Sequence, residues 1–153
     1  MIEERIKEII GYELPSAPKP VAAYVPAQIS GNLIFTSGQL PMKEGKLIAE
    51  GKVGAEVEED KAIECARTCA LNCLSAMKSV IGNLDKIEQV VKVVAFINSA
   101  PEYSSQPKVA NGASEFLIQV FGERGKHARS AVGVSALPLN APVEIEMIFR
   151  IKV

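Results

Sequence analysis

A run of apolar residues near the middle of the chain constrains the fold more than any other segment. Within a predicted strand at residues 87–97, residues 90–97 read Val-Val-Lys-Val-Val-Ala-Phe-Ile, a nearly continuous series of β-branched and aromatic side chains. Such a run is typical of a central strand that is covered on at least one face. The rest of the chain must therefore supply neighbouring strands and the elements that pack on them.

Three segments show the spacing of amphipathic helices. Residues 57–81 repeat apolar side chains every three or four positions, carry acidic residues in the first turn and end at Gly82. Residues 109–121 repeat the pattern and predict a second helix. Residues 2–11 place isoleucines between charges, so we expect residues 1–13 to form an N-terminal helical extension.

The segments between these helices predict extended structure. Residues 14–26 contain four prolines, which exclude a regular helix. Residues 32–37 are rich in strand formers and are ended by Gly38. The glycine-containing residues 42–54 predict a hairpin or loop around residues 47–48.

The C-terminal third predicts two further strands and completes the topology. They cover residues 128–136 and 143–153, and the connection between them is long enough to turn an antiparallel pair. The whole order predicts an α+β fold, a mixed β-sheet with two helices packed on one face. The other sheet face is left bare, and its burial favours a homo-oligomer.

Composition and charge narrow the classes of protein. A chain of 153 residues with 48% apolar side chains is expected to form a single domain spanning residues 1–153. Its 17 basic and 18 acidic side chains nearly cancel, so the chain has no large positive electrostatic field that would attract a nucleic acid. No apolar run approaches the roughly 20 residues that cross a bilayer, and residues 1–5 are acidic where a signal peptide would be basic. We therefore expect a cytoplasmic protein without a membrane or nucleic-acid partner.

The cysteines and the one histidine favour packing over metal chemistry. Cys65, Cys69 and Cys73 would share one face of the predicted helix, where a disulfide is poorly placed. Their preferred interpretation is small side chains that fill a helix–sheet interface, and no metal is expected. Dinucleotide, nucleoside-triphosphate and zinc-protease motifs are absent, so no cofactor is expected. His127 lacks the motif of a serine hydrolase and is interpreted as a partly exposed loop residue.

Polar side chains gather at the ends of the apolar strands. They are Tyr24, residues 37–39 (Ser-Gly-Gln), the pair Arg129 and Ser130, and two glutamates within the last strand, Glu144 and Glu146. The two glutamates share a strand face, and a charge in a buried strand is costly unless it is paired. Two interpretations stay open: a cleft that at least one of them faces, or a solvent-facing pair on an edge strand.

Three segments together resemble the RidA/YjgF family. They are residues 24–41, residues 90–97 and residues 129–146, in the family's order, and the likeness extends over residues 22–153. It implies a chorismate-mutase-like homotrimer with clefts between subunits. It also implies hydrolysis of reactive enamines or imines, such as 2-aminoacrylate, to 2-keto acids and ammonia. The ligand would be a small metabolite that carries a carboxylate.

The resemblance assigns roles to individual residues. Arg129 would clamp the substrate carboxylate, which a planar guanidinium does bidentately. Glu144 would orient the attacking water, and Tyr24 would close over the substrate. Ser37, followed by Gly38, would lie beside the bound imine.

Two further positions and several departures complete the comparison. Asn111 matches a cleft asparagine of the family. Ala131 stands where a cysteine is common, at a position that acts through its backbone carbonyl. Residues 22–23 replace a Gly-Pro pair, and the loop at residues 99–107 is an addition.

Two other functions remain as alternatives. Part of the family is labelled endoribonuclease or translation inhibitor, which the lack of a basic and aromatic stripe disfavours. The other alternative is a non-catalytic trimer in which Arg129 only holds a small carboxylate. A binding cleft and a catalytic cleft would use the same arginine.

Overall fold

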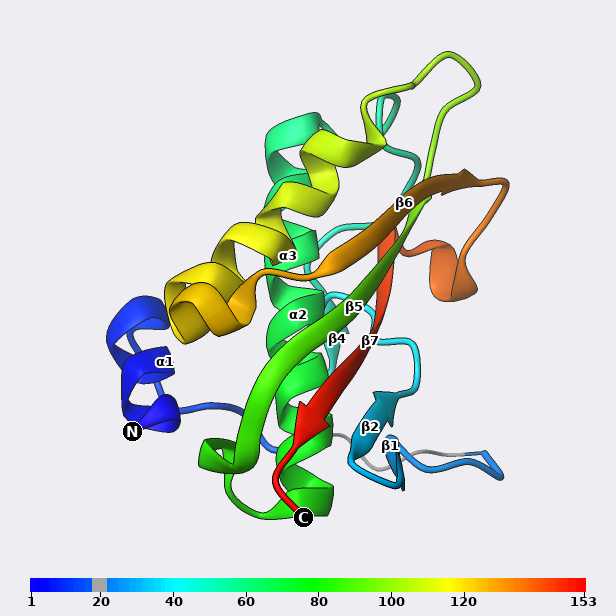
Figure 1. Ribbon diagram of the computed structural model, residues 1–153. Coiled ribbons are helices and arrows are strands. Elements are labelled where there is room, and N and C mark those ends of the chain that lie inside the picture. Colours follow the sequence, from blue (N-terminus) through cyan, green and yellow to red (C-terminus); the bar gives the residue numbers. More distant parts are fainter. Residues whose placement is uncertain (18–21) are drawn as a thin grey trace.

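The computed structural model describes residues 1–17 and 22–153. Part of the proline-rich segment predicted to be extended, including Pro18 and Pro20, lies outside the described residues. The helices and strands, labelled as in Figure 1, are α1 (Ile2–Ile10), β1 (Ala27–Ser30), β2 (Leu33–Thr36), β3 (Met42–Lys43), β4 (Lys46–Leu47), α2 (Glu59–Ile81), η1 (Leu84–Lys86), β5 (Ile87–Asn98), α3 (Gln106–Phe121), η2 (Gly122–Gly125), β6 (Ala128–Val134), η3 (Pro138–Asn140) and β7 (Val143–Ile151).

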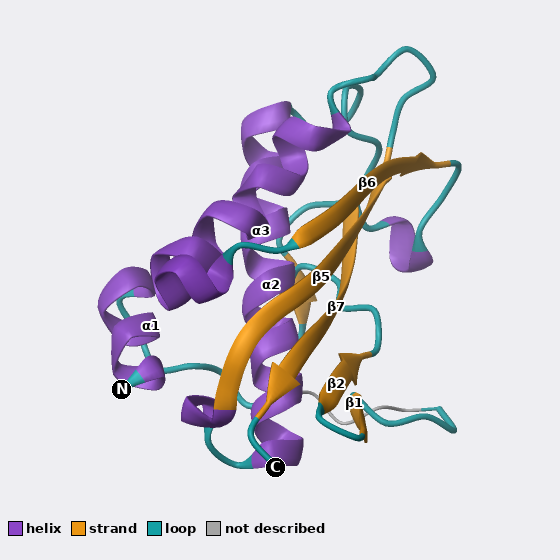
Figure 2. Ribbon diagram, in the orientation of Figure 1, coloured by secondary structure: helices purple, strands orange, loops and turns teal. Residues whose placement is uncertain are grey.

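Five strands form one mixed sheet in the order β1-β2-β7-β5-β6. β5 runs antiparallel to β7 on one edge and parallel to β6 on the other. Helices α2 and α3 lie on the same side of this sheet (Figure 2). The predicted α+β arrangement is confirmed, and we call the face opposite these helices the open face. Apolar side chains on the strands remain accessible there, with Phe35 38% exposed and Val132 43% exposed.

The predicted antiparallel pair of the last two strands is wrong. β6 and β7 are not hydrogen-bonded to each other, because β5 lies between them. The connection through η3 passes the end of β5 rather than forming a hairpin. The physical reason is that the apolar β5 can satisfy both of its backbone edges only with a strand on each side.

The N-terminal half contains one strand that the sequence did not predict. Ala27–Ser30 pairs with β2 as a hairpin whose turn contains Gly31 at φ 62°. A hairpin is present within the predicted segment as β3 and β4, but it covers only residues 42–47 and is not centred on residues 47–48. Its turn lies at Glu44 and Gly45, which both have positive φ, the backbone that two-residue hairpin turns require.

Helix α2 packs its cysteine-bearing face on the sheet. The thiol of Cys69 lies 3.6 Å from the carbonyl oxygen of Val143, and that of Cys73 lies 3.4 Å from that of Ile145. Burial raises the pKa of Cys73 to about 12, so its thiol is protonated at neutral pH. The expected packing role is confirmed. Neither α2 nor any other helix among the described residues is long and apolar enough to span a membrane.

The N-terminal helix is anchored to the domain at specific points. Ile2 and Ile6 are buried, which explains the isoleucine spacing in this segment. The Ile2 amide donates to a carboxylate oxygen of Asp85 at 2.9 Å. Arg5 Nε donates to the carbonyl oxygen of Gln119 at 2.7 Å. The extension is therefore bound to η1 and to α3.

Gly112 lies where α3 packs tightly against α2, and it generates a test of this packing. Glycine to alanine inside a helix ordinarily stabilises by about 1 kcal/mol. Here an added Cβ would overlap the carbonyl oxygen of Ile63. We expect Gly112→Ala to lower the free energy of unfolding by about 1–3 kcal/mol, measured by denaturant titration. The exposed Gln119→Ala is the control and should change it by less than about 0.5 kcal/mol. A Gly112→Ala protein that is stabilised would contradict the packing.

Candidate functional site

The first group of predicted site residues surrounds Glu144. This side chain leaves β7 on the open face and is half-buried. Burial raises the pKa of its carboxyl group, and repulsion from Glu146 raises it further. β7 is the middle strand of the sheet, so the alternative that places the glutamates on an edge strand is wrong.

Gly38 and Ser37 bring the end of β2 against this carboxylate. A Cβ on Gly38 would lie 2.9 Å from Glu144 Cδ, so only a glycine allows the approach. The Ser37 hydroxyl donates to the carbonyl oxygen of Val25 at 2.6 Å, and its amide donates to that of Pro26 at 2.8 Å. These bonds hold the segment that carries Tyr24, which is 56% exposed.

The second group of predicted site residues surrounds Arg129. This arginine lies on β6, an edge strand, and is partly buried. Its Nη1 donates to Asn111 Oδ1 at 2.8 Å and to Ser114 Oγ at 3.1 Å. No acidic oxygen lies within ion-pair distance of it among residues 1–17 and 22–153. Arg129 and Asn111 are therefore in direct contact.

The hydrogen bonds of Arg129 leave one edge of its guanidinium available. Both hydrogens of Nη1 are used by Asn111 and Ser114. On the other edge the Nε hydrogen and one Nη2 hydrogen are parallel, and they bond to no described residue. Two parallel donors are the arrangement that binds a carboxylate bidentately.

Ala131 lies two residues beyond Arg129 on the same face of β6. It pairs with Ala95 in β5 and packs against the hydrophobic core. A side chain at this position therefore fills a helix–sheet interface.

The two groups lie on opposite faces of the sheet. Arg129 is in register with the buried Val93, and Glu144 is in register with Phe96. Paired residues on neighbouring strands point to the same face, whereas residues three apart on one strand point to opposite faces. One chain therefore does not bring Arg129 and Glu144 together.

Sequence reasoning did not connect two residues, Ser114 and His127, with Arg129. Ser114 Oγ lies 2.8 Å from His127 Nε2, and His127 Nδ1 lies 2.6 Å from the carbonyl oxygen of Gly125. Burial lowers the pKa of His127, and the charge of Arg129 lowers it further. The expected position of His127 in a partly exposed loop is confirmed, and the structure adds its two hydrogen-bond partners. The sequence signal that could have found Ser114 is its spacing, because it lies one helical turn after Asn111 and so shares the same helix face.

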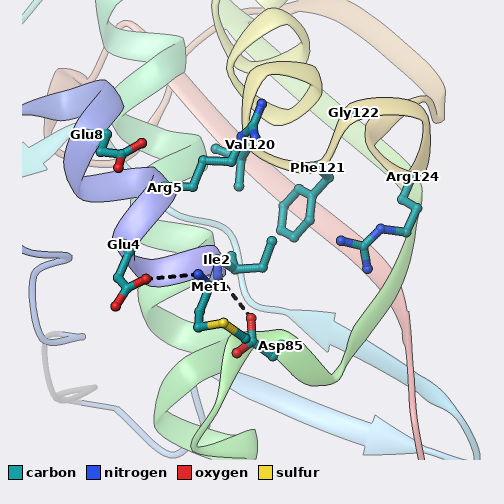
Figure 3. A pocket seen from close by; sticks show the side chains of 10 residues that line it. All are labelled: Met1, Ile2, Glu4, Arg5, Glu8, Asp85, Val120, Phe121, Gly122 and Arg124. Atoms are coloured by element: carbon teal, nitrogen blue, oxygen red, sulfur yellow. Dashed lines mark hydrogen bonds and ion pairs between the residues drawn. The ribbon is translucent and has the colours of Figure 1, made fainter.

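A separate cleft of about 520 Å³ lies beside the N-terminal helix (Figure 3). Two arginines line it, but both are occupied by backbone carbonyls: Arg5 by Gln119 and Arg124 by Ile87. None of the residues predicted to form the site lines this cleft. It is therefore distinct from both groups described above.

The mixed sheet with helices on one side defines a chorismate-mutase-like α+β protein. The sequence profile of the family described as "YjgF/chorismate_mutase-like, putative endoribonuclease" matches residues 3–150. The chain therefore belongs to the YjgF/RidA family.

Several relatives span nearly the full length of the chain. A solved structure from Agrobacterium tumefaciens, described as having unknown function, is 47% identical with a TM-score of 0.92, covering 99% of this chain and 92% of that one. Protein TCP17 of Trypanosoma cruzi is 41% identical over 93% of this chain and 89% of its own length. A 2-iminobutanoate/2-iminopropanoate deaminase of Dermatophagoides farinae is 31% identical over 90% of this chain and 93% of its own length.

The contact between Gly38 and Glu144 generates a test of the first group. We expect Gly38→Ala to displace the carboxylate, because the contact is with the movable end of that side chain. Displacement of a reacting group can cost on the order of 10²-fold in rate. The melting temperature should stay within a few degrees of wild type. Steady-state kinetics measures the rate, and thermal unfolding measures the melting temperature. The control is Gly31→Asn, because Gly31 lies at an open turn. Unchanged kinetics in Gly38→Ala would exclude Glu144 from the chemistry.

Proposed function

We propose that the protein is a hydrolytic deaminase of reactive enamines and imines, such as 2-aminoacrylate and its imine, which it converts to 2-keto acids and ammonia. The observation that carries this proposal is the guanidinium of Arg129. It is partly buried, has two parallel donors available and meets no acidic group among the described residues. The deaminase named among the relatives supports the same chemistry.

The working form we propose is a homotrimer whose sites lie between copies. A small substrate cannot contact Arg129 and Glu144 of one chain, because they lie on opposite sheet faces. A second copy that packs on the open face would supply the missing group and bury Phe35 and Val132. The ligand we propose is a small metabolite that carries a carboxylate. The reaction would need no cofactor and would take place in the cytoplasm.

The proposed reaction needs only orientation and one water molecule. Arg129 holds the substrate carboxylate, which fixes the plane of the imine. Glu144 of a neighbouring copy accepts a hydrogen bond from water and directs its oxygen to the imine carbon. Addition forms a carbinolamine, whose C–N bond then breaks to release ammonia and leave the keto group. Ser37 and Gly38 lie beside the reacting carbon, and Tyr24 covers the site.

The endoribonuclease alternative is less well supported. The family description contains that activity. The chain has a net charge of −1, however, and phosphate contacts by basic side chains dominate the affinity for nucleic acids. We expect any binding of RNA to be weaker than about 10⁻⁶ M at physiological salt.

A first prediction concerns the geometry of the clamp. We expect Arg129→Lys to lower deamination by about 10²-fold or more, because an ammonium is a point charge without two parallel donors. Ammonia release from freshly generated 2-aminoacrylate measures this effect.

The fold of the Arg129→Lys protein should be nearly unaffected, because Arg129 pairs with no carboxylate among the described residues and its replacement therefore leaves none unpaired. Light scattering should give about three times 16.4 kDa for both proteins, with melting temperatures within a few degrees. A large fall in melting temperature with activity retained would instead make Arg129 a structural residue.

A second prediction concerns pH. Glu144 must be ionised to orient water, so kcat/KM should rise with pH through a pKa above that of an ordinary glutamate. Glu144→Gln should lower the rate by about 10²-fold and abolish this rise of kcat/KM with pH, the acidic limb of the profile. Glu146→Gln removes the repelling charge, so the limb should move to lower pH. A limb that is identical in wild type and in Glu146→Gln would show that another group titrates.

A further inference from the structure

The only histidine of the sequence lies in a hydrogen-bonded chain that ends at Arg129. The carbonyl oxygen of Gly125 can only accept, so His127 Nδ1, 2.6 Å away, carries a hydrogen. In the neutral ring Nε2 is then an acceptor. The hydroxyl of Ser114, 2.8 Å from Nε2, therefore donates to it. This fixes the Ser114 hydroxyl so that its oxygen lone pairs face Arg129 Nη1, 3.1 Å away.

The surroundings favour the neutral form of this histidine. Burial and the positive charge of Arg129 both lower the pKa of His127. The other charged groups on the adjoining elements include Glu123 and Lys126, which pair with each other at 3.0 Å. The remaining ones are Lys108 and Glu115 on α3, Arg124 on η2, and Glu88 and Lys92 on β5. No acidic side chain among the described residues forms an ion pair with His127.

We propose that Ser114 and His127 are positioning residues that fix the guanidinium of Arg129 for its carboxylate ligand. The inference rests on the proposed function of Arg129 and adds the device that aims it. Asn111 and Ser114 together take both hydrogens of Nη1, which restrains rotation of the planar guanidinium about the Cδ–Nε bond. The edge formed by Nε and Nη2 is thereby held toward the ligand. His127 in turn holds Ser114, so the orientation is set from the backbone of Gly125 outward.

Binding of a non-reacting carboxylate tests the proposal without catalysis. Pyruvate is titrated by calorimetry into the wild-type protein and into Arg129→Ala, Ser114→Ala, Ser114→Thr and His127→Phe. We expect Arg129→Ala to abolish binding and Ser114→Ala to weaken it about tenfold, the usual effect of one lost hydrogen bond to a charged group. Ser114→Thr keeps the hydroxyl and should bind nearly as the wild type does. The affinity of His127→Phe for pyruvate should lie between those of Ser114→Ala and Ser114→Thr.

Control and contrary results separate this inference from the proposed function. Ser79→Ala, whose hydroxyl donates to Ala76 on α2, should bind as the wild type does. Wild-type affinity in Ser114→Ala and His127→Phe, with loss in Arg129→Ala, would overturn the positioning role and leave the proposed function standing. Binding that is absent from the wild type would overturn the proposed function.

Nuclear magnetic resonance of the His127 ring tests its contacts with Gly125, Ser114 and Arg129 directly, and it needs no ligand. Because the chain has one histidine, its ring nitrogens give a single set of ¹⁵N signals. We expect the neutral ring to carry its hydrogen on Nδ1, and Arg129→Ala to raise the pKa of His127. A ring that carries hydrogen on Nε2, or one whose titration Arg129→Ala leaves unchanged, would overturn the inference. Covalent labelling of Ser114 by a fluorophosphonate would also overturn it, because Ser114 would then be a nucleophile.

Discussion

The pairing of β5 on both of its edges determines how the two groups of candidate site residues are arranged. Its antiparallel partner β7 carries Glu144, and its parallel partner β6 carries Arg129. The register places the arginine on the face that the helices cover and the glutamate on the open face. Twisting the sheet does not change this parity, because side chains alternate strictly along a regular strand. The division of the site between two faces is thus a property of the strand pairing and not of any loop.

Each half of the site is stabilised by different neighbours. On the helix-covered side, Arg129 is held by uncharged partners from α3, which keep the charge oriented without neutralising it. On the open side, the Glu144 carboxylate is partly desolvated beside Gly38 and keeps a raised pKa. A cation and an anion prepared in this way, neither paired within the described part of the chain, are complementary across an interface between two copies.

The sequence predicted the elements better than their pairing. Residues 90–97 predicted a buried strand because their apolar run is local information, and α2 and α3 followed from their spacing for the same reason. Which strands flank β5 depends on contacts between distant residues, so the β6–β7 pair was predicted wrongly. The contact of Arg129 with Asn111 agrees with the family resemblance. Ser114 was not singled out and His127 was interpreted only as a loop residue, because nothing connects the two until the fold brings them together.

The central claim is that one site takes Arg129 from one copy and Glu144 from another. Co-expression of Arg129→Ala and Glu144→Gln chains in equal amounts tests it most directly, with deamination measured on the mixed trimers. In a symmetric trimer formed at random, about a quarter of the sites would combine both intact residues, so the mixture should recover about a quarter of wild-type activity. Each variant expressed alone should remain nearly inactive. A mixture no more active than its two components would contradict the account, because the two residues would then have to act within one chain.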